Sequence, residues 1–353
     1  MSAKLTRVRG TISLQGNKPP HIVYNKQKLP PQKSNENKMP PLGEHVTVLL
    51  ESAVEYLNIK PSGIYIDTTL GRGGHSALIL KQLGPEGRLI AIDKDPTAIE
   101  AAQQLFGHDK RVEITHGSFT LLGSLVAERG LTGQINGILM DLGISSPQVD
   151  DATRGFSFMK EGPLDMRMDT TQGITAAQWL AEVKEQELAD ALWMYGDERF
   201  SRRIACTICQ QREVEPLTTT LQLAELVKRI YPRPKPSQRK RIHPATRTFQ
   251  AIRIIINQEL DDLSIALQQA VNVLALEGRL VVISFHSLED RIVKRFMRDK
   301  ARGKQFPADL PILDCDLGRQ LQRIDGIITP SDEEVENNPR ARSAVMRVAE
   351  KIA

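Results

Sequence analysis

Hydrophobic and polar positions near the start of the folded part of this chain have the pattern of strands separated by helices. β-Branched and aromatic residues lead from Ile64 to the acidic Asp67, a glycine-rich turn follows, and residues 76–83 have the spacing of a helix. A second apolar strand, residues 88–93, again ends in a carboxylate, Asp93. This order of strand, turn, helix and strand predicts the first βα unit of a nucleotide-type binding site.

The turn between these two strands indicates which ligand suits the site. Glycines let the chain turn sharply and let a ligand lie against the backbone, and the N–H groups of the following helix favour an anion. A dinucleotide fingerprint would place a third glycine at position 76, where this chain has Ser76. The turn therefore favours S-adenosylmethionine without excluding NAD. Asp93 follows at roughly the distance of an acid that meets ribose hydroxyls.

Strands and helices continue to alternate as far as Asp141, which predicts a parallel sheet with helices on both faces. The predicted elements are a helix from Asp95 to Leu105, a strand at 111–115, a helix ending at Arg129 and a strand at 134–141. Ligands bind at the carboxyl ends of such strands, so we expect four side chains at one rim: Asp67, Asp93, Phe119 and Asp141. For Phe119, contact with an adenine and packing in the core are equally consistent with the sequence.

The pattern becomes purely helical from Gln148 to about Pro244. Helices are predicted at 175–195, 197–212 and 220–230, then a long helix at 246–276 before a strand at 279–285, with further strands at 323–329 and 343–349. Ser287 and Asp290 have the spacing of a capping box for the helix after the 279–285 strand. The order predicts an α/β fold, in which a mostly parallel, doubly wound, Rossmann-like core carries an inserted all-helical domain.

Two short motifs favour structural roles. Cys206 and Cys209 have redox-motif spacing, but they lie inside a predicted helix and not at a strand-to-helix turn, so we interpret them as helix-face residues. Asp165 and Asp169 flank Arg167 without a neighbouring histidine, which is more typical of a salt-bridged loop than of a metal site. No metal is predicted.

Composition limits the class of protein. The chain has 353 residues, 40% hydrophobic and 25% charged, which is ordinary globular usage. No apolar run approaches the ~18 residues of a membrane span, three cysteines cannot build a disulfide framework, and no signal-peptide pattern is present, so we expect a cytoplasmic protein without a membrane partner. Residues 1–43 are rich in Lys, Pro, Asn and Gln and are predicted to be a disordered basic tail, with a transit peptide as the competing interpretation.

Charge is distributed unevenly, although the net charge is only +4. Nine Lys or Arg and no acid lie between Lys228 and Arg253, and a second basic run lies between Arg291 and Lys304. Such runs are often solvated faces, but two of them beside a ribose-ligand site favour a nucleic-acid substrate. The candidate RNA contacts are Arg239, Lys240, Arg241, Arg247, Arg291 and Arg295.

Seven longer stretches together resemble the bacterial small-subunit (16S) ribosomal RNA cytosine-N4 methyltransferase family. They are residues 71–76, 141–147, 154–159, 162–169, 243–250, 284–291 and 338–343, and the similarity runs from about His45 to the C-terminus. The resemblance implies an S-adenosylmethionine-dependent enzyme that methylates the exocyclic amine of a decoding-centre cytosine in 16S rRNA, within the small ribosomal subunit. It implies these donor-binding residues: Gly73, Gly74, His75, Asp93, Phe119, Asp141 and Gln148.

The same resemblance suggests a division of the chain. Residues 44–148 and 245–353 would form the two parts of the methyltransferase core, and residues 149–244 would form the inserted helical domain that recognises the substrate.

Asp141 is also the candidate catalytic residue. Methyl transfer is an in-line displacement that depends on positioning, and an acceptor for the cytosine N4 proton would localise the lone pair of this poor nucleophile. Many amino-methyltransferases carry an Asp-Pro-Pro-Tyr type motif at this point, whereas this chain has Asp141-Leu-Gly-Ile144. Phe156 or Phe158 could be the base platform, but core packing explains them equally well. The alternative functions are an NAD-dependent oxidoreductase, which leaves the basic runs unexplained, and a non-catalytic RNA-binding ribosome-assembly factor, which leaves the glycine turn unexplained.

Overall fold

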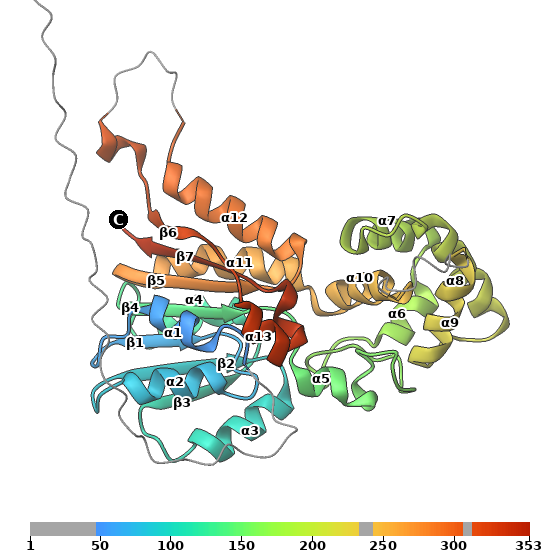
Figure 1. Cartoon of the computed structure of the whole chain (residues 1–353), viewed down its shortest axis with the longest axis horizontal. Helices are drawn as coiled ribbons and strands as arrows, with labels where there is room; N and C mark the ends of the chain where they lie inside the picture. Colours follow the sequence, from blue (N-terminus) through green and yellow to red (C-terminus); the bar gives the residue numbers. More distant parts are fainter. Residues whose placement is uncertain (1–46, 233–242, 306–312) are drawn as a thin grey trace, which may run out of the picture. The chain divides into compact units, whose positions relative to one another are not determined.

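A seven-stranded sheet forms the centre of the computed structural model, which describes residues 47–232, 243–305 and 313–353 (Figure 1). The strand order is β3-β2-β1-β4-β5-β7-β6. The strands are β1 (Ile64–Asp67), β2 (Arg88–Asp93), β3 (Val112–His116), β4 (Ile135–Asp141), β5 (Leu274–Ser284), β6 (Leu321–Ile328) and β7 (Val345–Lys351). β1 to β5 pair in parallel, whereas β7 is antiparallel to both β5 and β6. This confirms the predicted mostly parallel, Rossmann-like core.

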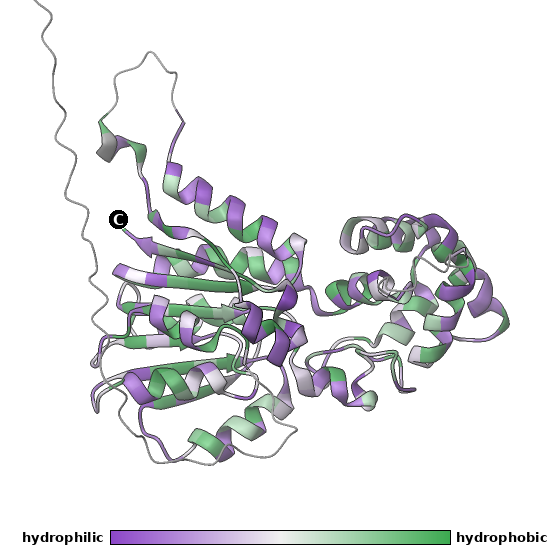
Figure 2. Cartoon of the chain, viewed as in Figure 1, coloured by the Kyte–Doolittle hydropathy of each residue, from purple (hydrophilic) through white to green (hydrophobic). Residues whose placement is uncertain are grey.

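Helices cover both faces of this sheet. The helices outside the inserted segment are α1 (Leu50–Leu57), α2 (Gly74–Gln82), α3 (Pro96–Phe106), α4 (Leu122–Glu128), α11 (Glu259–Val273), α12 (Ser287–Arg302) and α13 (Asp332–Asn337). Alternate strand residues face opposite layers, so Ile66 packs with α4, α11 and α12 while the neighbouring Tyr65 packs with α1 and α2. Hydrophobic residues are concentrated along the central strands, whereas α12 is largely hydrophilic along its length (Figure 2).

A buried tyrosine shows how closely the first strand is fitted. Tyr65 is fully buried, and its hydroxyl accepts a hydrogen bond of 2.7 Å from the backbone N–H of Lys60. A Cβ at Gly137 of β4 would lie 2.8 Å from the Tyr65 ring, so a glycine is needed on the neighbouring strand. This packing fixes β1 against β4, the two strands that carry Asp67 and Asp141 at their ends.

A second hydrophobic cluster is built by helices that follow the fourth strand. They are α6 (Ala176–Glu182), α7 (Glu185–Gly196), α8 (Ser201–Val214), α9 (Thr220–Ile230) and α10 (Ala245–Asn257), whereas the short α5 (Ser146–Asp150) precedes them and contributes no residue to the cluster. The cluster runs from Phe156 to Ile252 and contains most of the buried face of α10. The boundaries of the inserted domain, residues 149 and 244, stay a prediction. The packing of α10 against the helical cluster favours placing its C-terminal boundary near Asn257 instead of at residue 244.

The structure corrects two predicted helices. The predicted helix at 246–276 is two helices and the start of a strand, because Gln258 adopts a left-handed conformation (φ 53°) and ends α10. The predicted helix at 175–195 is likewise broken, because Val183 and Lys184 are extended between α6 and α7.

The predicted cap of α12 is also displaced by one residue. His286 is the N-cap and Glu289 completes the capping box, while Asp290 forms a two-point ion pair with Arg347. Among the described residues, no helix combines the length and the apolar character needed to cross a membrane.

Candidate functional site

A cavity of about 580 Å³ lies at the carboxyl ends of the parallel strands, as the topology predicts. Its lining includes most of the predicted donor-binding residues, namely Gly74, His75, Asp93, Phe119, Asp141 and Gln148. Gly73 is not part of the lining. It occupies the left-handed N-cap position of α2 (φ 76°), and a Cβ there would lie 2.6 Å from the Phe106 ring. Gly73 therefore shapes the turn without facing the cavity.

The turn after β1 is held by a buried carboxylate. Asp67 Oδ2 accepts a hydrogen bond of 2.7 Å from the Ser76 hydroxyl, and its other oxygen accepts one from the backbone N–H of Thr69. Burial raises the pKa of Asp67 to about 6, although both hydrogen bonds oppose the shift. The serine that departs from the dinucleotide pattern thus has a structural role, because it fastens the start of α2 to the end of β1.

Asp93 both faces the cavity and holds the glycine turn. Its two carboxylate oxygens accept hydrogen bonds from the backbone N–H groups of Gly71 (2.7 Å) and Asp95 (2.8 Å). Burial raises the pKa of Asp93 to about 6, against the effect of these two hydrogen bonds. Each oxygen retains a second lone pair, so a rigidly placed carboxylate can still accept from ribose hydroxyls.

Gln148 lines the cavity and is held there by a hydrogen-bond network that the sequence did not predict. Its Nε2 donates a hydrogen bond of 2.8 Å to Asp95 Oδ2, and Nη1 of the buried Arg154 donates one of 2.7 Å to the same oxygen. Arg154 Nη2 also donates to the backbone oxygens of Arg167 and Met168. The only sequence signals were Asp95 before a proline and Arg154 in a family-like motif, and neither indicated that the two would pair.

Asp141 lies at the tip of β4, where β1 is the neighbour on one side and β5 on the other. Its Oδ2 is 3.8 Å from His75 Nδ1, and its backbone N–H donates to the Thr69 hydroxyl at 2.7 Å. Asp141 Oδ1 is buried and has no hydrogen-bond partner among the described residues. Burial raises the pKa of Asp141 well above its ordinary value, with Asp67 and Glu289 adding to the shift. A buried acceptor without a partner in a cavity is a candidate functional group.

The far end of the cavity carries charged residues that the sequence did not assign to a site. Arg253 donates two hydrogen bonds of 2.7 Å to the two oxygens of Glu259, and Glu289 accepts from the backbone N–H of Phe285. Burial would raise the pKa of Glu289, but contact with His286 and the charge of Arg253 lower it below its ordinary value.

This end of the cavity also holds a group of potential metal ligands. Glu259, His286 and Glu289 have ligand atoms within 4.8 Å of one another. The guanidinium of Arg253 already binds both oxygens of Glu259, which disfavours a metal cation there. The other suspected metal motif is a salt-bridged loop, as predicted, because Arg167 binds Asp165 through two hydrogen bonds.

Two of the three candidate aromatic residues lie away from the cavity. Phe156 is buried in the helical cluster, and Phe158 packs against Phe249 and His243 with ring centroids 4.9 and 4.5 Å away. Neither is part of the cavity lining. Phe119 does line the cavity while also packing against the sheet core, and the Lys94 ammonium lies 5.8 Å from its ring centroid.

The candidate RNA contacts fall into three groups. Arg239, Lys240 and Arg241 lie outside the described residues. Arg247 is exposed and donates a hydrogen bond to the backbone oxygen of Asp197. Arg291 and Arg295 are exposed on α12 and form no ion pair with the described residues.

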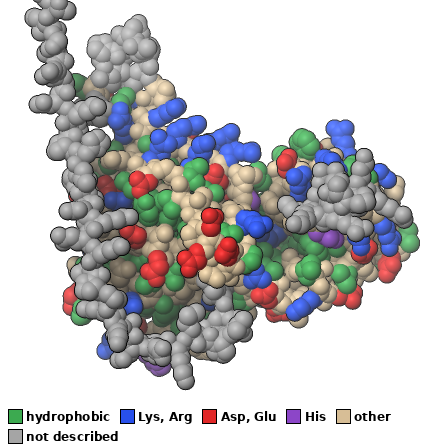
Figure 3. Space-filling view, in the orientation of Figure 1, with side chains coloured by type: hydrophobic (Ala, Val, Ile, Leu, Met, Phe, Trp, Pro, Cys, Tyr) green, Lys and Arg blue, Asp and Glu red, His purple; other side chains and the backbone are tan. Residues whose placement is uncertain are grey.

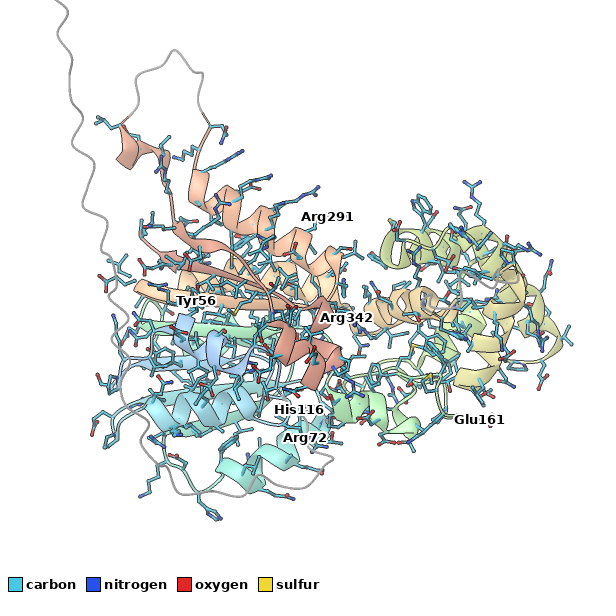
Figure 4. All side chains as sticks on the ribbon, viewed as in Figure 1. Tyr56, Arg72, His116, Glu161, Arg291 and Arg342 are labelled. Atoms are coloured by element: carbon cyan, nitrogen blue, oxygen red, sulfur yellow. The ribbon has the colours of Figure 1, made fainter. Side chains whose placement is uncertain are left out.

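The basic face of α12 is visible in two views. Figure 3 shows a row of Lys and Arg side chains along this helix, and Figure 4 labels Arg291 near its start.

The basic run between Lys228 and Arg253 is paired with acidic residues at its two ends. Lys228 is paired with Glu225 at 2.7 Å and Arg253 is buried against Glu259. The sequence argument considered only acids inside the basic run, whereas both partners lie just outside it. The Arg253 pair is shielded from solvent, so this cation is not available as a simple phosphate contact, whereas Lys228 and Glu225 are both exposed and their pair leaves Lys228 accessible.

Comparison with known proteins identifies the family of this chain. The sequence profile of the MraW methylase family matches residues 43–352. An rRNA methylase from Streptococcus thermophilus is 10% identical, with 88% of this chain and 100% of that chain covered and a TM-score of 0.40. An S-adenosylmethionine-dependent O-methyltransferase from Thermotoga maritima is 10% identical, with 85% and 63% covered and a TM-score of 0.35. The family match confirms the resemblance noted in the sequence and the expected methyl donor.

Proposed function

Since this chain belongs to the MraW methylase family and is an S-adenosylmethionine-dependent rRNA methyltransferase, we propose that it methylates the exocyclic N4 amine of a decoding-centre cytosine in 16S rRNA. The observation that supports this most directly is that Asp141 lines the cavity and that its buried Oδ1 has no hydrogen-bond partner among the described residues. An amine N–H is a suitable donor for such an oxygen. An NAD-dependent oxidoreductase is not supported by the family match, and neither is a non-catalytic assembly factor.

The residues around the glycine turn fit the methyl donor. Asp93 would accept from its ribose hydroxyls, the N–H groups at the start of α2 would face its carboxylate, and Phe119 would contact its adenine. When bound, the donor supplies an electrophilic methyl group. The described residues bind and orient both substrates, which suffices for an in-line displacement.

Asp141 would act on the acceptor. Its Oδ1 would accept a hydrogen bond from the N4 amine, which localises the nitrogen lone pair and stabilises positive charge that develops there. Burial raises the pKa of Asp141 and so favours its protonated form. A positive charge nearby favours the carboxylate, so the sulfonium of the donor would convert Asp141 into an acceptor.

The remaining parts of the chain would bind the RNA. Arg291 and Arg295 of α12, which form no ion pair with the described residues, suit phosphate groups. We assign recognition of the substrate to the helices within residues 149–244, and we place the substrate in a cytoplasmic small ribosomal subunit. The target base must leave its stack to reach a cavity of this kind, as in other enzymes that modify bases.

One assay tests this function. The protein is incubated with labelled S-adenosylmethionine and small ribosomal subunits, and the rRNA is digested and its nucleosides are identified. We expect label in N4-methylcytidine, with the labelled rRNA fragment mapping to a single 16S position, and labelling at least ~10-fold slower with Asp141→Asn at matched donor saturation. Label in another nucleoside, or in 16S rRNA outside the decoding centre, would refute the proposed product or position. Free 16S rRNA, tested in parallel, shows whether the assembled subunit is the substrate.

A further inference from the structure

One wall of the cavity is made by residues that the proposed donor site does not use. They come from the chain after residue 244, namely Thr246, Arg253, Glu259, Phe285 and Glu289. β4 lies between β1 and β5 in the sheet, so Asp141 separates the donor turn after β1 from the residues after β5. The acceptor base would therefore approach Asp141 from the β5 side.

Phe285 is the aromatic residue on that side. β4 and β5 pair with Asp141 opposite Ile283, and the backbone N–H of Leu142 donates to the Ile283 oxygen at 2.9 Å. Phe285 follows Ile283 by two residues, which brings it level with Gly143. The Phe285 ring carbon Cδ2 lies 3.6 Å from the position that a Cβ would occupy at Gly143. The ring thus lies directly beside the loop that begins at Asp141.

This position explains a departure in the sequence. The Leu142-Gly143-Ile144 segment after Asp141 has no aromatic residue, whereas an aromatic residue follows the acid in many amino-methyltransferases. Gly143 has no side chain to cover the neighbouring Phe285 ring, and its backbone (φ 95°) is one that glycine adopts readily. The aromatic ring beside this loop therefore belongs to Phe285, which directly follows β5, and not to the segment that follows the acid.

Arg253 offers hydrogen-bond donors to the same space. Its Nε and Nη2 are held by Glu259, while Nη1 has no acceptor among the described residues and the side chain lines the cavity. The charges of Glu259 and Glu289 outweigh the effect of burial and raise the pKa of Arg253, so the guanidinium remains charged. A guanidinium fixed by a carboxylate at two points is a rigid donor for a planar partner.

We propose that Phe285 and Arg253 form the subsite for the target base, with the cytosine ring stacked on Phe285 and its N3 and O2 accepting hydrogen bonds from Arg253 Nη1. This deepens the proposed function and depends on it. Cytosine presents acceptors at N3 and O2, whereas uracil presents an N–H at position 3, so a guanidinium there favours cytosine. Reading of the Watson–Crick edge together with stacking is how other base-modifying enzymes hold an extruded base.

The role of Arg253 is tested with an altered substrate. Small subunits are reconstituted with 16S rRNA that carries 3-deazacytidine at the target position, which replaces the N3 acceptor with C–H. For the unaltered protein we expect kcat/KM to fall roughly 10–100-fold relative to cytidine, the usual range for one good base-edge contact. Arg253→Met should have a lower kcat/KM on the cytidine substrate than the unaltered protein. For this variant we expect kcat/KM on the two substrates to differ less than about twofold. An equal loss with both proteins would show that Arg253 does not contact N3.

Phe285 is tested with a matched pair of variants. We expect Phe285→Leu to lower kcat/KM for the subunit roughly 10-fold or more, because stacking on the base is lost, while Phe285→Tyr keeps most activity. Both should keep the donor affinity of the unaltered protein, measured by calorimetry, which shows that the fold is retained. Full activity of Phe285→Leu would overturn the platform. If the unaltered protein formed no N4-methylcytidine at all, the proposed function would fail before either test applied.

Discussion

Arg154 Nη1 donates a hydrogen bond of 2.7 Å to Asp95 Oδ2, and this ion pair joins the inserted segment to the donor side of the cavity. Both side chains are buried. The same Asp95 oxygen accepts from Gln148, and Arg154 also holds the backbone oxygens of Arg167 and Met168. The position of Gln148 in the cavity therefore depends on a residue that does not line it.

We expect Arg154→Met to reduce donor affinity about 10-fold and to lower the free energy of unfolding by roughly 3 kcal/mol, because a buried carboxylate loses its partner. Calorimetry with the donor and urea unfolding measure the two effects. Lys60→Met is the matched control, since it removes an exposed pair with Glu277 and should change stability by less than about 1 kcal/mol. Unchanged donor affinity in Arg154→Met would show that the hydrogen bonds of Arg154 and Asp95 do not contribute to donor binding.

Asp93 should make the stability of the ligand-free protein depend on pH. Its folded-state pKa of about 6 is above the ordinary value, so its contribution to stability is fully present below about pH 4 and is lost as the pH rises through 6. Between pH 4 and pH 7, the protein should lose up to about 3 kcal/mol relative to Asp93→Asn, which does not titrate. Urea unfolding of both proteins across this range measures the difference, and the exposed Asp190→Asn is the control. A constant difference across the range would contradict the prediction.

Asp93 should also determine donor affinity. We expect Asp93→Ala to weaken donor binding by about 2 kcal/mol or more, because the ribose loses a charge-assisted acceptor and the Gly71 and Asp95 N–H groups lose theirs. Calorimetry at pH 8 measures this loss. Affinity equal to that of the unaltered protein would remove Asp93 from the donor site.

Asp141 should give donor binding a different pH dependence. Burial favours its neutral form in the empty cavity, and a bound cation favours the carboxylate, so donor affinity should rise with pH through the raised pKa and then level off. Asp141→Asn should bind the donor with little pH dependence from this group, and its single-turnover rate at saturating donor should fall at least ~10-fold. A normal rate combined with weaker binding would restrict Asp141 to the donor pocket.

The sequence predicted the donor side of the cavity better than the acceptor side, and the reason is physical. The glycine turn, Asp93 and Asp141 are set by strand ends and local turns, which follow from short-range patterns. Arg154 and Asp95 are 59 residues apart and meet only through tertiary packing. Arg253 and Glu259 are close in sequence, but on one continuous helix they would point about 120° apart around the axis. The left-handed Gln258 between them brings them together, and the hydrophobic pattern contained no sign of it.

The aromatic residues show the same limit. For Phe156 and Phe158 the sequence left a base platform and core packing equally open, and both residues pack into the helical cluster. Phe285 is 144 residues beyond Asp141 and reaches it through strand pairing, which the sequence pattern alone does not specify.

The exposed basic face of α12 should contribute to RNA binding without affecting the donor. Arg291, Lys294 and Arg295 are exposed and unpaired among the described residues, whereas Arg298 on the same helix is paired with Asp299. When such cations bind RNA phosphates, the counterions that had condensed on the RNA are released, so the affinity for RNA depends on the salt concentration. Replacing the three with alanine should weaken binding to 16S rRNA and reduce the slope of log affinity against log salt by roughly 2 to 3.

The basic segment before α10 should act in the same way, and comparing the two sets separates their contributions. Arg239→Ala, Lys240→Ala and Arg241→Ala, combined in one protein, should also flatten the salt dependence and leave donor affinity unchanged. Arg298→Ala is the matched control because its charge is already balanced by Asp299, so it should change the slope by clearly less than one. If the α12 triple variant keeps the original slope while the 239–241 variant loses it, the RNA backbone is bound by that segment and the row of cations on α12 is a solvated face.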